Sequence, residues 1–392
     1  MHVLKVLELF LIQPLVWVGL IRCYLAARRR VRYERHQFKS AIDAHYIEVR
    51  NFFKGGLVLG VAATLVSLGL GLVVSPVWAV IYELLAVVSL IIVPNGLVPV
   101  TVFGLSWLVY WGLKPSLTTQ LSTQLQMHGV ATLGLNSGVI ISGCLILGLG
   151  FAATAILLRR RETQLNSPQI RPDQRGKRIV RYRWQQLLVL PVGVLIPGDW
   201  IHATVAWWPV FQFGSQQFSV LLLPLLLGVS AQVYKQQPQL AWRRLAKRYW
   251  LLAAVSVVFA IVARVATLSP RWSIGLLGLL VAGVWAILAQ HRYHDRHQQF
   301  WFSDTDLGVR VIGIRPHTPA TKLDLSIGDV ILACNRQPVH SEAEFYAALL
   351  ISPTYVHLKV RNVEQQLIIT ETAIYNGAPH ELGIVLFTDQ ED

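Results

Sequence analysis

Long apolar runs separated by basic segments make up most of the chain up to residue 290. A helix needs about 20 apolar residues to cross the hydrocarbon core of a bilayer, and several of these runs reach that length. We therefore predict that residues 1–290 form an all-α polytopic transmembrane domain of about seven to nine helices. The ranges predicted as helices are 3–25, 55–74, 77–93, 95–113, 133–158, 187–206, 219–233, 250–268 and 272–289.

Basic residues predict the orientation of these helices. The first run is followed by Arg28-Arg29-Arg30, the reverse of the charge order in a secretory signal peptide, so we expect an uncleaved segment with its N-terminus outside. Lys and Arg also gather in 159–186 and 234–249, and alternating sides places every basic segment and the C-terminus in the cytoplasm. The pair 77–93 and 95–113 also fits a re-entrant hairpin, which leaves this orientation unchanged, whereas losing 219–233 alone would invert it.

Beyond residue 300 the pattern changes to short alternating segments. Gly308 to Ile314 alternates as a half-buried strand should, and a second strand is expected from Val330 to Asn335 after the turn residues Gly328-Asp329. Ser341 is the expected N-cap of a helix, with Glu344 completing a capping box. Two further strands are expected at 355–360 and 366–370. The pattern thus predicts a small α+β domain over 300–392, joined to the membrane by a juxtamembrane linker over 291–299.

The order strand, Pro316-His317-Thr318-Pro319-Ala320, Gly328-Asp329-Val330-Ile331 and Asn335 resembles the central part of a PDZ domain. That resemblance implies a partly open antiparallel barrel with helices, which binds the C-terminus of a partner as an added strand. We expect a circularly permuted order, with the carboxylate loop and binding strand at Leu382, Gly383, Ile384 and Val385 and the apolar lining at Phe345 and Leu349. The alternative position for the loop is Leu307, Gly308 and Val309.

Composition supports a membrane protein and limits its partners. The chain is 54% hydrophobic and 14% charged, with a mean hydropathy of +0.48, which is too apolar for a soluble protein of 392 residues. Its formal charge is +14, but the basic residues flank apolar runs, which favours anionic lipid headgroups over nucleic acid. The three cysteines form no disulfide or zinc pattern.

Candidate chemistry is sparse. The chain lacks the His-Glu-x-x-His pattern of an intramembrane metalloprotease, and neither His380 nor Ser137 belongs to a plausible catalytic set, so we predict no catalytic residues, no metal and no cofactor. His291, His294 and His297 recur every third residue, a pattern that fits one metal or, more simply, a solvated linker. Three polar residues inside apolar runs indicate either a functional path or structural pairs within the bundle. They are Glu83, Asp199 and Arg264.

The whole chain resembles the MinJ family of cell-division topological determinants from Gram-positive rods. The resemblance rests on Glu8-Leu9-Phe10 and Pro14-Leu15, the basic run from Arg28 to Phe38, the polytopic region and the terminal PDZ domain. It implies a non-enzymatic scaffold, enriched at septum and poles, that links a DivIVA-like coiled-coil protein to a MinD-like and MinC-like division inhibitor. The alternatives are a PDZ-regulated transporter and an intramembrane protease-like quality-control protein. Assembly into a homo-oligomer is compatible with each of these functions.

Overall fold

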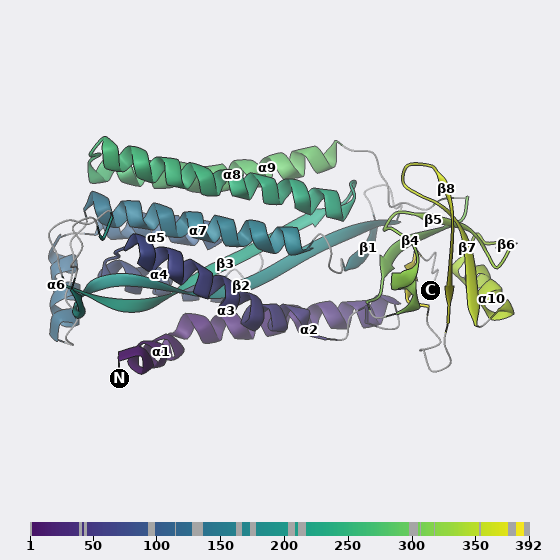
Figure 1. Ribbon diagram of the computed structural model, residues 1–392, viewed down its shortest axis with the longest axis horizontal. Coiled ribbons are helices and arrows are strands. Elements are labelled where there is room, and N and C mark those ends of the chain that lie inside the picture. The colour runs from purple at the N-terminus through teal and green to yellow at the C-terminus, as the bar shows by residue number, and fades with distance from the viewer. Residues whose placement is uncertain are drawn as a thin grey trace.

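The computed structural model describes residues 2–387 except 39–40, 43–44, 93–98, 114, 128–135, 162–166, 173–177, 203–207, 211–216, 298–304, 306, 317, 353 and 375–381. Long helices and one long β-hairpin form an elongated bundle, and a small domain lies at one end of it (Figure 1). The helices of the bundle are α1 (His2–Ile12), α2 (Pro14–Phe38), α3 (Ile47–Leu70), α4 (Pro76–Ile92), α5 (Pro99–Gly112), α6 (Pro115–Met127), α7 (Ser137–Arg161), α8 (Pro238–Val265) and α9 (Pro270–Arg296).

The helical, membrane-compatible part of the prediction is confirmed. Among the described residues, α3, α7, α8 and α9 are long and apolar enough to cross a membrane, and α1 with α2 forms a fifth candidate span bent by 56°. Pro14 lies at that bend, where it starts α2, because proline is tolerated in the first turn but not inside a helix. Pro238 and Pro270 likewise start α8 and α9. Helix α4 has 17 residues and α5 has 14, both short for a full span, and they pack together as a pair.

Helices were expected at 187–206 and 219–233, but the described residues of these ranges, 187–202 and 219–233, form strands instead. They belong to β2 (Arg178–His202) and β3 (Gln217–Val233), which pair antiparallel from Tyr182↔Val233 to Ile196↔Ser219. A shorter strand, β1 (Pro168–Pro172), pairs with the start of β2. Pro191 and Pro224 lie directly opposite each other, and each would lie past the first turn of the expected helix, where proline breaks or kinks it. The orientation argument survives this correction, because a hairpin returns to the side on which it began.

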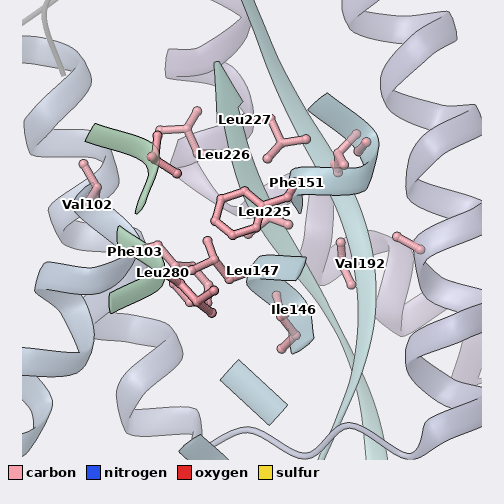
Figure 2. Packing of buried hydrophobic residues seen from close by; sticks show 14 of the residues in the cluster. Val102, Phe103, Ile146, Leu147, Phe151, Val192, Leu225, Leu226, Leu227 and Leu280 are labelled. Carbon is pink, nitrogen blue, oxygen red and sulfur yellow. The ribbon is translucent and has the colours of Figure 1, made fainter. Parts of the chain in front are cut away.

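The hairpin lies inside the helical bundle, and side chains of the helices pack against both of its faces. Figure 2 shows Ile146, Leu147 and Phe151 of α7 packed against Val192 of β2 and Leu225 of β3. Apolar residues therefore occupy successive positions of both strands, as in sheets that are buried on both sides. Such a run has no period of two, which is why its sequence looks like a membrane helix.

Helices also satisfy the edges of this hairpin. Thr64 of α3 donates its hydroxyl to the carbonyl of Pro191 at 3.1 Å and accepts from the N–H of Gly193 at 2.8 Å. On the β3 edge, Leu226 donates its N–H to the hydroxyl of Tyr82 at 2.8 Å. Open strand edges are tolerated at membrane depth only where protein covers them. These two side chains, together with the backbone bonds of Leu195 to Leu72 and Val74, satisfy part of each edge.

The C-terminal domain has the α+β arrangement that the pattern predicted. Its elements are β4 (Val309–Ile314), the 3₁₀ turn η1 (Pro319–Lys322), β5 (Val330–Cys334), β6 (Gln337–Pro338), α10 (Glu342–Ile351), β7 (Tyr355–Arg361), β8 (Leu367–Ala373) and β9 (Ile384–Leu386). The strand order is β8-β7-β5-β4-β9, with β6 paired to β5. The last described strand, β9, thus lies beside β4, the first described strand of the domain, as a circular permutation requires.

Local chemistry explains the start of α10 and its position. Ser341 accepts a hydrogen bond from the N–H of Glu344 at 3.2 Å, as expected of the N-cap. The Glu344 carboxylate accepts from the N–H of His340 at 2.7 Å, one residue before the N–H of Ser341 that a capping box would use. Asn335 occupies a left-handed conformation (φ 49°) after β5. Its amide donates to Ala348 of α10 and accepts from His357 of β7, so one turn residue fixes the helix against the sheet.

Candidate peptide-binding site

Strand β9 ends the sheet and is preceded by a glycine in an unusual conformation. Among the described strands, β4 is its one neighbour, so the opposite edge of β9 has no strand partner there, which is the position that an added strand takes. Gly383 has a φ of +90°, which side-chain-bearing residues rarely adopt, and a Cβ there would overlap the side chain of Thr318. Arg315 donates its N–H to the Gly383 carbonyl at 2.7 Å and Ala320 donates to Leu382 at 2.9 Å, which fixes the loop against η1.

Four of the predicted site residues come together in the core of this domain. Leu382 and Ile384 join one buried apolar cluster with Phe345 and Leu349 of α10. The loop, the edge strand and the helix are therefore combined as a PDZ groove requires, although these apolar side chains are almost fully covered in this structure. Tyr346, one residue along α10, remains 40% exposed.

Val385 is oriented differently from the other predicted groove residues. Because side chains alternate along a strand, Val385 points away from the cluster around α10. It packs with Ile312 and Phe387 against Val180 and Tyr182 of β2. The Tyr182 hydroxyl donates to the carbonyl of Ile312 at 2.8 Å. The C-terminal domain is thus docked on the end of the long hairpin through the sheet face opposite its own core.

The alternative loop at Leu307, Gly308 and Val309 leads into a strand with no open edge. Strand β4 already lies between β5 and β9, with Val309 opposite Ile331. A Cβ at Gly308 would overlap the backbone carbonyl of Ile331, so this glycine permits the close approach of β5. This geometry favours the loop at Leu382 over the one at Leu307.

The three polar residues predicted inside the membrane lie on separate elements. Glu83 of α4 has Oε1 3.5 Å from the N–H of Leu15, in the first turn of α2, where helix N–H groups lack intrahelical acceptors. Asp199 is exposed at a bulge of β2 between Pro197 and Ile201, and Arg264 lies in the last turn of α8. The contact of Glu83 supports a structural role for that residue, and the roles of all three stay predictions.

The histidines near the end of α9 have separate partners. His291 lies 3.3 Å from the carbonyl of Gln232, His294 contacts Arg244, and the Asp295 carboxylate accepts from the N–H of Tyr234 at 3.0 Å. The described part of the chain has no group of three or more residues suited to hold a metal. Helix α9 also continues to Arg296, so most of the linker predicted at 291–299 is helical. Ser137 begins α7, and His380 lies outside the described residues.

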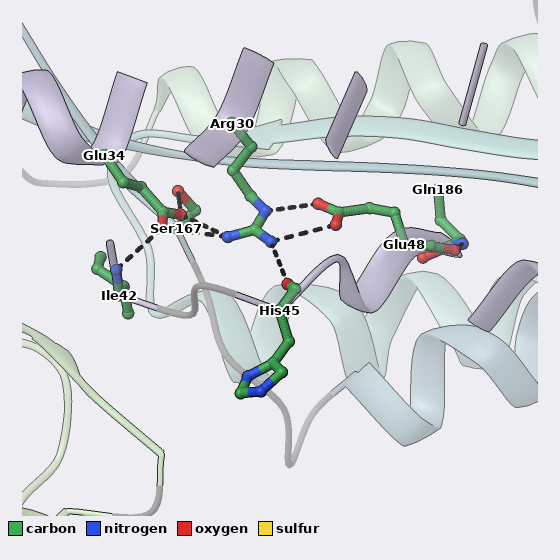
Figure 3. A network of polar contacts seen from close by, with 7 residues as sticks. All are labelled: Arg30, Glu34, Ile42, His45, Glu48, Ser167 and Gln186. Atoms are coloured by element: carbon green, nitrogen blue, oxygen red, sulfur yellow. Dashed lines mark hydrogen bonds and ion pairs between the residues drawn. The ribbon is translucent and has the colours of Figure 1, made fainter. Parts of the chain in front are cut away.

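Sequence reasoning missed a polar network that joins α2, α3 and the approach to β1. Arg30 donates to both Glu34 and Glu48, and Glu34, whose side chain is completely buried, also accepts from Ser167 at 2.7 Å and from the N–H of Ile42 at 3.0 Å (Figure 3). The i,i+4 spacing of Arg30 and Glu34 was a visible signal. The contacts with Glu48 and Ser167 are long-range, and no local pattern indicates them.

Comparisons with known proteins match both the domain and the whole chain. Residues 299–356 match the PDZ domain family. The chain is 31% identical over 387 residues to the "Probable cell division topological determinant MinJ" of Lacticaseibacillus paracasei, covering 95% of each protein. It is 27% identical over 392 residues to the "Cell division topological determinant MinJ" of Bacillus subtilis (strain 168), covering 100% of this chain and 96% of that protein.

Proposed function

Because the chain belongs to the MinJ family of cell division topological determinants, we propose that it is a non-enzymatic membrane scaffold for division-site placement. It brings cytoplasmic division proteins to the membrane through protein contacts that include its PDZ domain. The open edge of β9 beside Gly383 is the observation that carries this proposal. The partners that the family resemblance implies are a DivIVA-like coiled-coil protein and a MinD-like protein, and binding both would concentrate the protein at septum and poles.

Binding at this edge follows from strand geometry. A partner's C-terminal segment adds antiparallel to β9, its carboxylate is held by backbone N–H groups of the loop from Leu382 to Ile384, and its last side chain enters between Ile384 and Phe345. These two side chains are buried here, so the groove opens slightly as the ligand enters. Tyr346 lies at the exposed side of α10 and contacts the ligand.

Photo-crosslinking in cells tests this placement. A photoreactive residue replaces Tyr346 beside the groove in one full-length variant and Leu367 in a control. Leu367 is 58% exposed but begins β8, at the other end of the sheet. We expect division proteins to be trapped from position 346 and not from 367. Equal trapping at the two positions, or capture only from 367, would move the contact away from β9.

The orientation is a second part of the proposal. The two ends of the hairpin strands near residues 178 and 233, the end of α2 and the PDZ domain all lie at the same end of the bundle (Figure 1). This end also carries Arg28 to Arg35, which supports a cytoplasmic location for it. A phosphatase reporter that is active only outside the membrane, fused after Asp392, should be inactive, and a fusion before Met1 should be active. The reverse pattern would reject this orientation.

A further inference from the structure

A cavity of about 600 Å³ lies near the cytoplasmic end of the bundle, apart from the peptide groove. It is enclosed by α2, by the facing parts of β2 and β3, and by the last turns of α9, with the ends of α4 and α5 at its inner end. On α2 it is lined by one helical face, which includes Arg22, Ala26, Arg29 and Tyr33. Its volume is within the range of roughly 300–1,000 Å³ that is typical of small-molecule sites.

The lining is strongly cationic. Its six arginines are Arg22, Arg29, Arg30, Arg183, Arg292 and Arg296. The lining contains two acids, and both have partners already: Glu48 is paired with Arg30, and Asp295 accepts from the N–H groups of Tyr234 and Lys235. The cavity therefore presents an excess of positive charge that its own acids do not balance.

Two of these arginines have buried donors without an acceptor. Nη2 of Arg22 and Nε of Arg183 are both inaccessible to solvent and lack a hydrogen-bond acceptor among the described residues. Buried polar atoms are nearly always hydrogen-bonded, and a guanidinium costs more than a neutral group when it is not. Both atoms belong to side chains that line the cavity, so a bound anion would supply the acceptors.

The cavity is also amphipathic, with the same polarity along three elements. Toward the cytoplasmic end, β2 changes from Leu187 to Arg183 and α9 from Leu288 to Arg292. Along β3 the lining changes from Leu226 to Gln232 in the same direction. Trp285, which also lines the apolar part, is 41% exposed, so this part reaches the outer surface of α9. A ligand that fits has an anionic head toward the cytoplasm and an apolar body toward the membrane.

We propose that this cavity binds one anionic phospholipid, with its phosphate between Arg22 and Arg183 and the upper part of its acyl chains against Leu187, Leu226 and Leu288. Guanidinium groups bind phosphate through charge-assisted hydrogen bonds, so phosphate oxygens would supply the acceptors that these two donors lack. The bound lipid holds α2, the hairpin and α9 together below the docked PDZ domain. This inference goes beyond the protein contacts proposed above and does not depend on them.

Lipid titration of the delipidated full-length protein in a zwitterionic detergent tests the proposal, with bound lipid counted by native mass spectrometry. We expect one retained phosphatidylglycerol and much weaker retention of phosphatidylcholine. In Arg22→Gln and in Arg183→Gln, the affinity for phosphatidylglycerol should fall by roughly tenfold or more, because each loses a charge-assisted hydrogen bond. The matched control is Arg28→Gln, which removes an exposed arginine of α2 outside the cavity and should leave the affinity unchanged.

The control variant and two competition experiments distinguish a specific lipid site from attraction by general surface charge and from binding of soluble anions. An equal loss in Arg28→Gln would overturn the proposal, because the surface potential would then account for binding. Inorganic phosphate and glycerol phosphate, added at concentrations well above the lipid, should displace little of it. Efficient displacement by either would assign the cavity to a soluble phosphate and reject the lipid.

A second variant keeps all the charges and fills the space. Ala26→Phe places a ring in the cavity from the lining face of α2, so it should abolish phosphatidylglycerol retention although every arginine is present. Thermal unfolding of the lipid-free proteins is the folding control. Arg22→Gln and Arg183→Gln should unfold no earlier than the parent, since each replaces a buried charge without an acceptor by a neutral amide, but should lose its stabilisation by phosphatidylglycerol. Unchanged lipid stabilisation in all three cavity variants would refute the site.

Discussion

The chain contains two antiparallel sheets whose strand edges need hydrogen-bond partners in different surroundings. In the PDZ sheet, β7 alternates between exposed or half-buried and buried positions, and each inner strand finds its hydrogen-bond partners on neighbouring strands. In the long hairpin, β2 and β3 are largely buried on both faces, and past the end of β1 the outer edge of β2 pairs with extended backbone, among the described residues, only at Leu195, which bonds to Leu72 and Val74. There the side chain of Thr64 bonds to the strand backbone.

This difference shows how a strand pair is tolerated among membrane helices. Water can satisfy an open edge in the PDZ sheet, whereas in the bundle each unmatched N–H or C=O would lie in an apolar environment. Helix α3 must therefore approach the backbone of β2 closely enough for a short side chain to reach it. The helix presents Gly56 and Gly60 to that strand, and this pair of small residues makes the approach possible.

The largest loss of stability is expected from a side chain that fills the close contact between α3 and β2. A Cβ at Gly60 would lie 2.5 Å from Cδ and 2.9 Å from the carbonyl oxygen of Pro191, so Gly60→Val must push α3 off β2. We expect a loss of about 3 kcal/mol or more in unfolding free energy, from overpacking together with lost hydrogen bonds. The measurement is thermal unfolding of the full-length protein in detergent. The control Gly69→Val, in the same helix with open space around its Cβ, should have little effect, and similar losses in both would refute the close-contact argument.

In the PDZ domain, Gly383 is the glycine whose lack of a side chain permits a close contact, as Gly60 does in the bundle. Gly383→Ala places a side chain at φ +90° and against Thr318, which we expect to cost about 2 kcal/mol and to disturb the loop before β9. Partner crosslinking from position 346 should fall with it, whereas the helical bundle should keep its thermal transition. Gly383→Ala with undiminished crosslinking would show that this loop does not hold the ligand. Gly308→Val is not a suitable control, because its side chain would meet the backbone carbonyl of Ile331.

Sequence patterns predicted the PDZ elements and the long helices but not the hairpin, for a physical reason. Strand β7 carries a period of two because one of its faces meets the core of the domain, and Ser341 with Glu344 is a local signal for α10. Strand β4 keeps that period only from Val309 to Val311, because Ile312 on its other face packs against β2. Burial on both faces removes that period from β2 and β3. The signals that remained were Pro191, Pro224 and the frequent valines of β2, which suit a strand better than a helix interior.

Contacts between residues far apart in the sequence could not be predicted from local sequence patterns. Nothing near Tyr182 in the sequence indicates that its hydroxyl bonds to Ile312, and nothing near Val385 shows which of the two faces of β9 it occupies until the strand is placed. The groove residues Leu382, Ile384, Phe345 and Leu349 were predicted together because the resemblance to PDZ domains supplied that long-range information.

A smaller effect should follow from removing the bond that replaces a strand. Thr64→Val keeps the size of the side chain but leaves the N–H of Gly193 and the carbonyl of Pro191 without their hydroxyl partner. Because a buried unsatisfied group costs about 1–3 kcal/mol, we expect a loss of about 2 kcal/mol in unfolding free energy. Thr64→Ser retains the hydroxyl and should recover most of that loss in the same thermal assay. If the serine variant is as unstable as the valine variant, packing of the methyl group explains the effect instead.

The smallest effect concerns the contact between the two sheets. Tyr182→Phe removes one buried hydroxyl that donates to Ile312 and keeps the ring in its cluster with Val385 and Phe387. We expect a loss of about 1 kcal/mol, the usual net value of one hydrogen bond, and it should appear locally because the cores on both sides remain intact. Hydrogen exchange of the full-length protein should therefore quicken about fivefold in β4 and β9 and stay constant in β7 and β8. The control Tyr24→Phe, at an exposed ring of α2, should change neither. Faster exchange throughout the PDZ sheet would mean that its contact with β2 stabilises the whole domain. Unchanged exchange in β4 would mean that the Tyr182 hydroxyl does not hold the two sheets together.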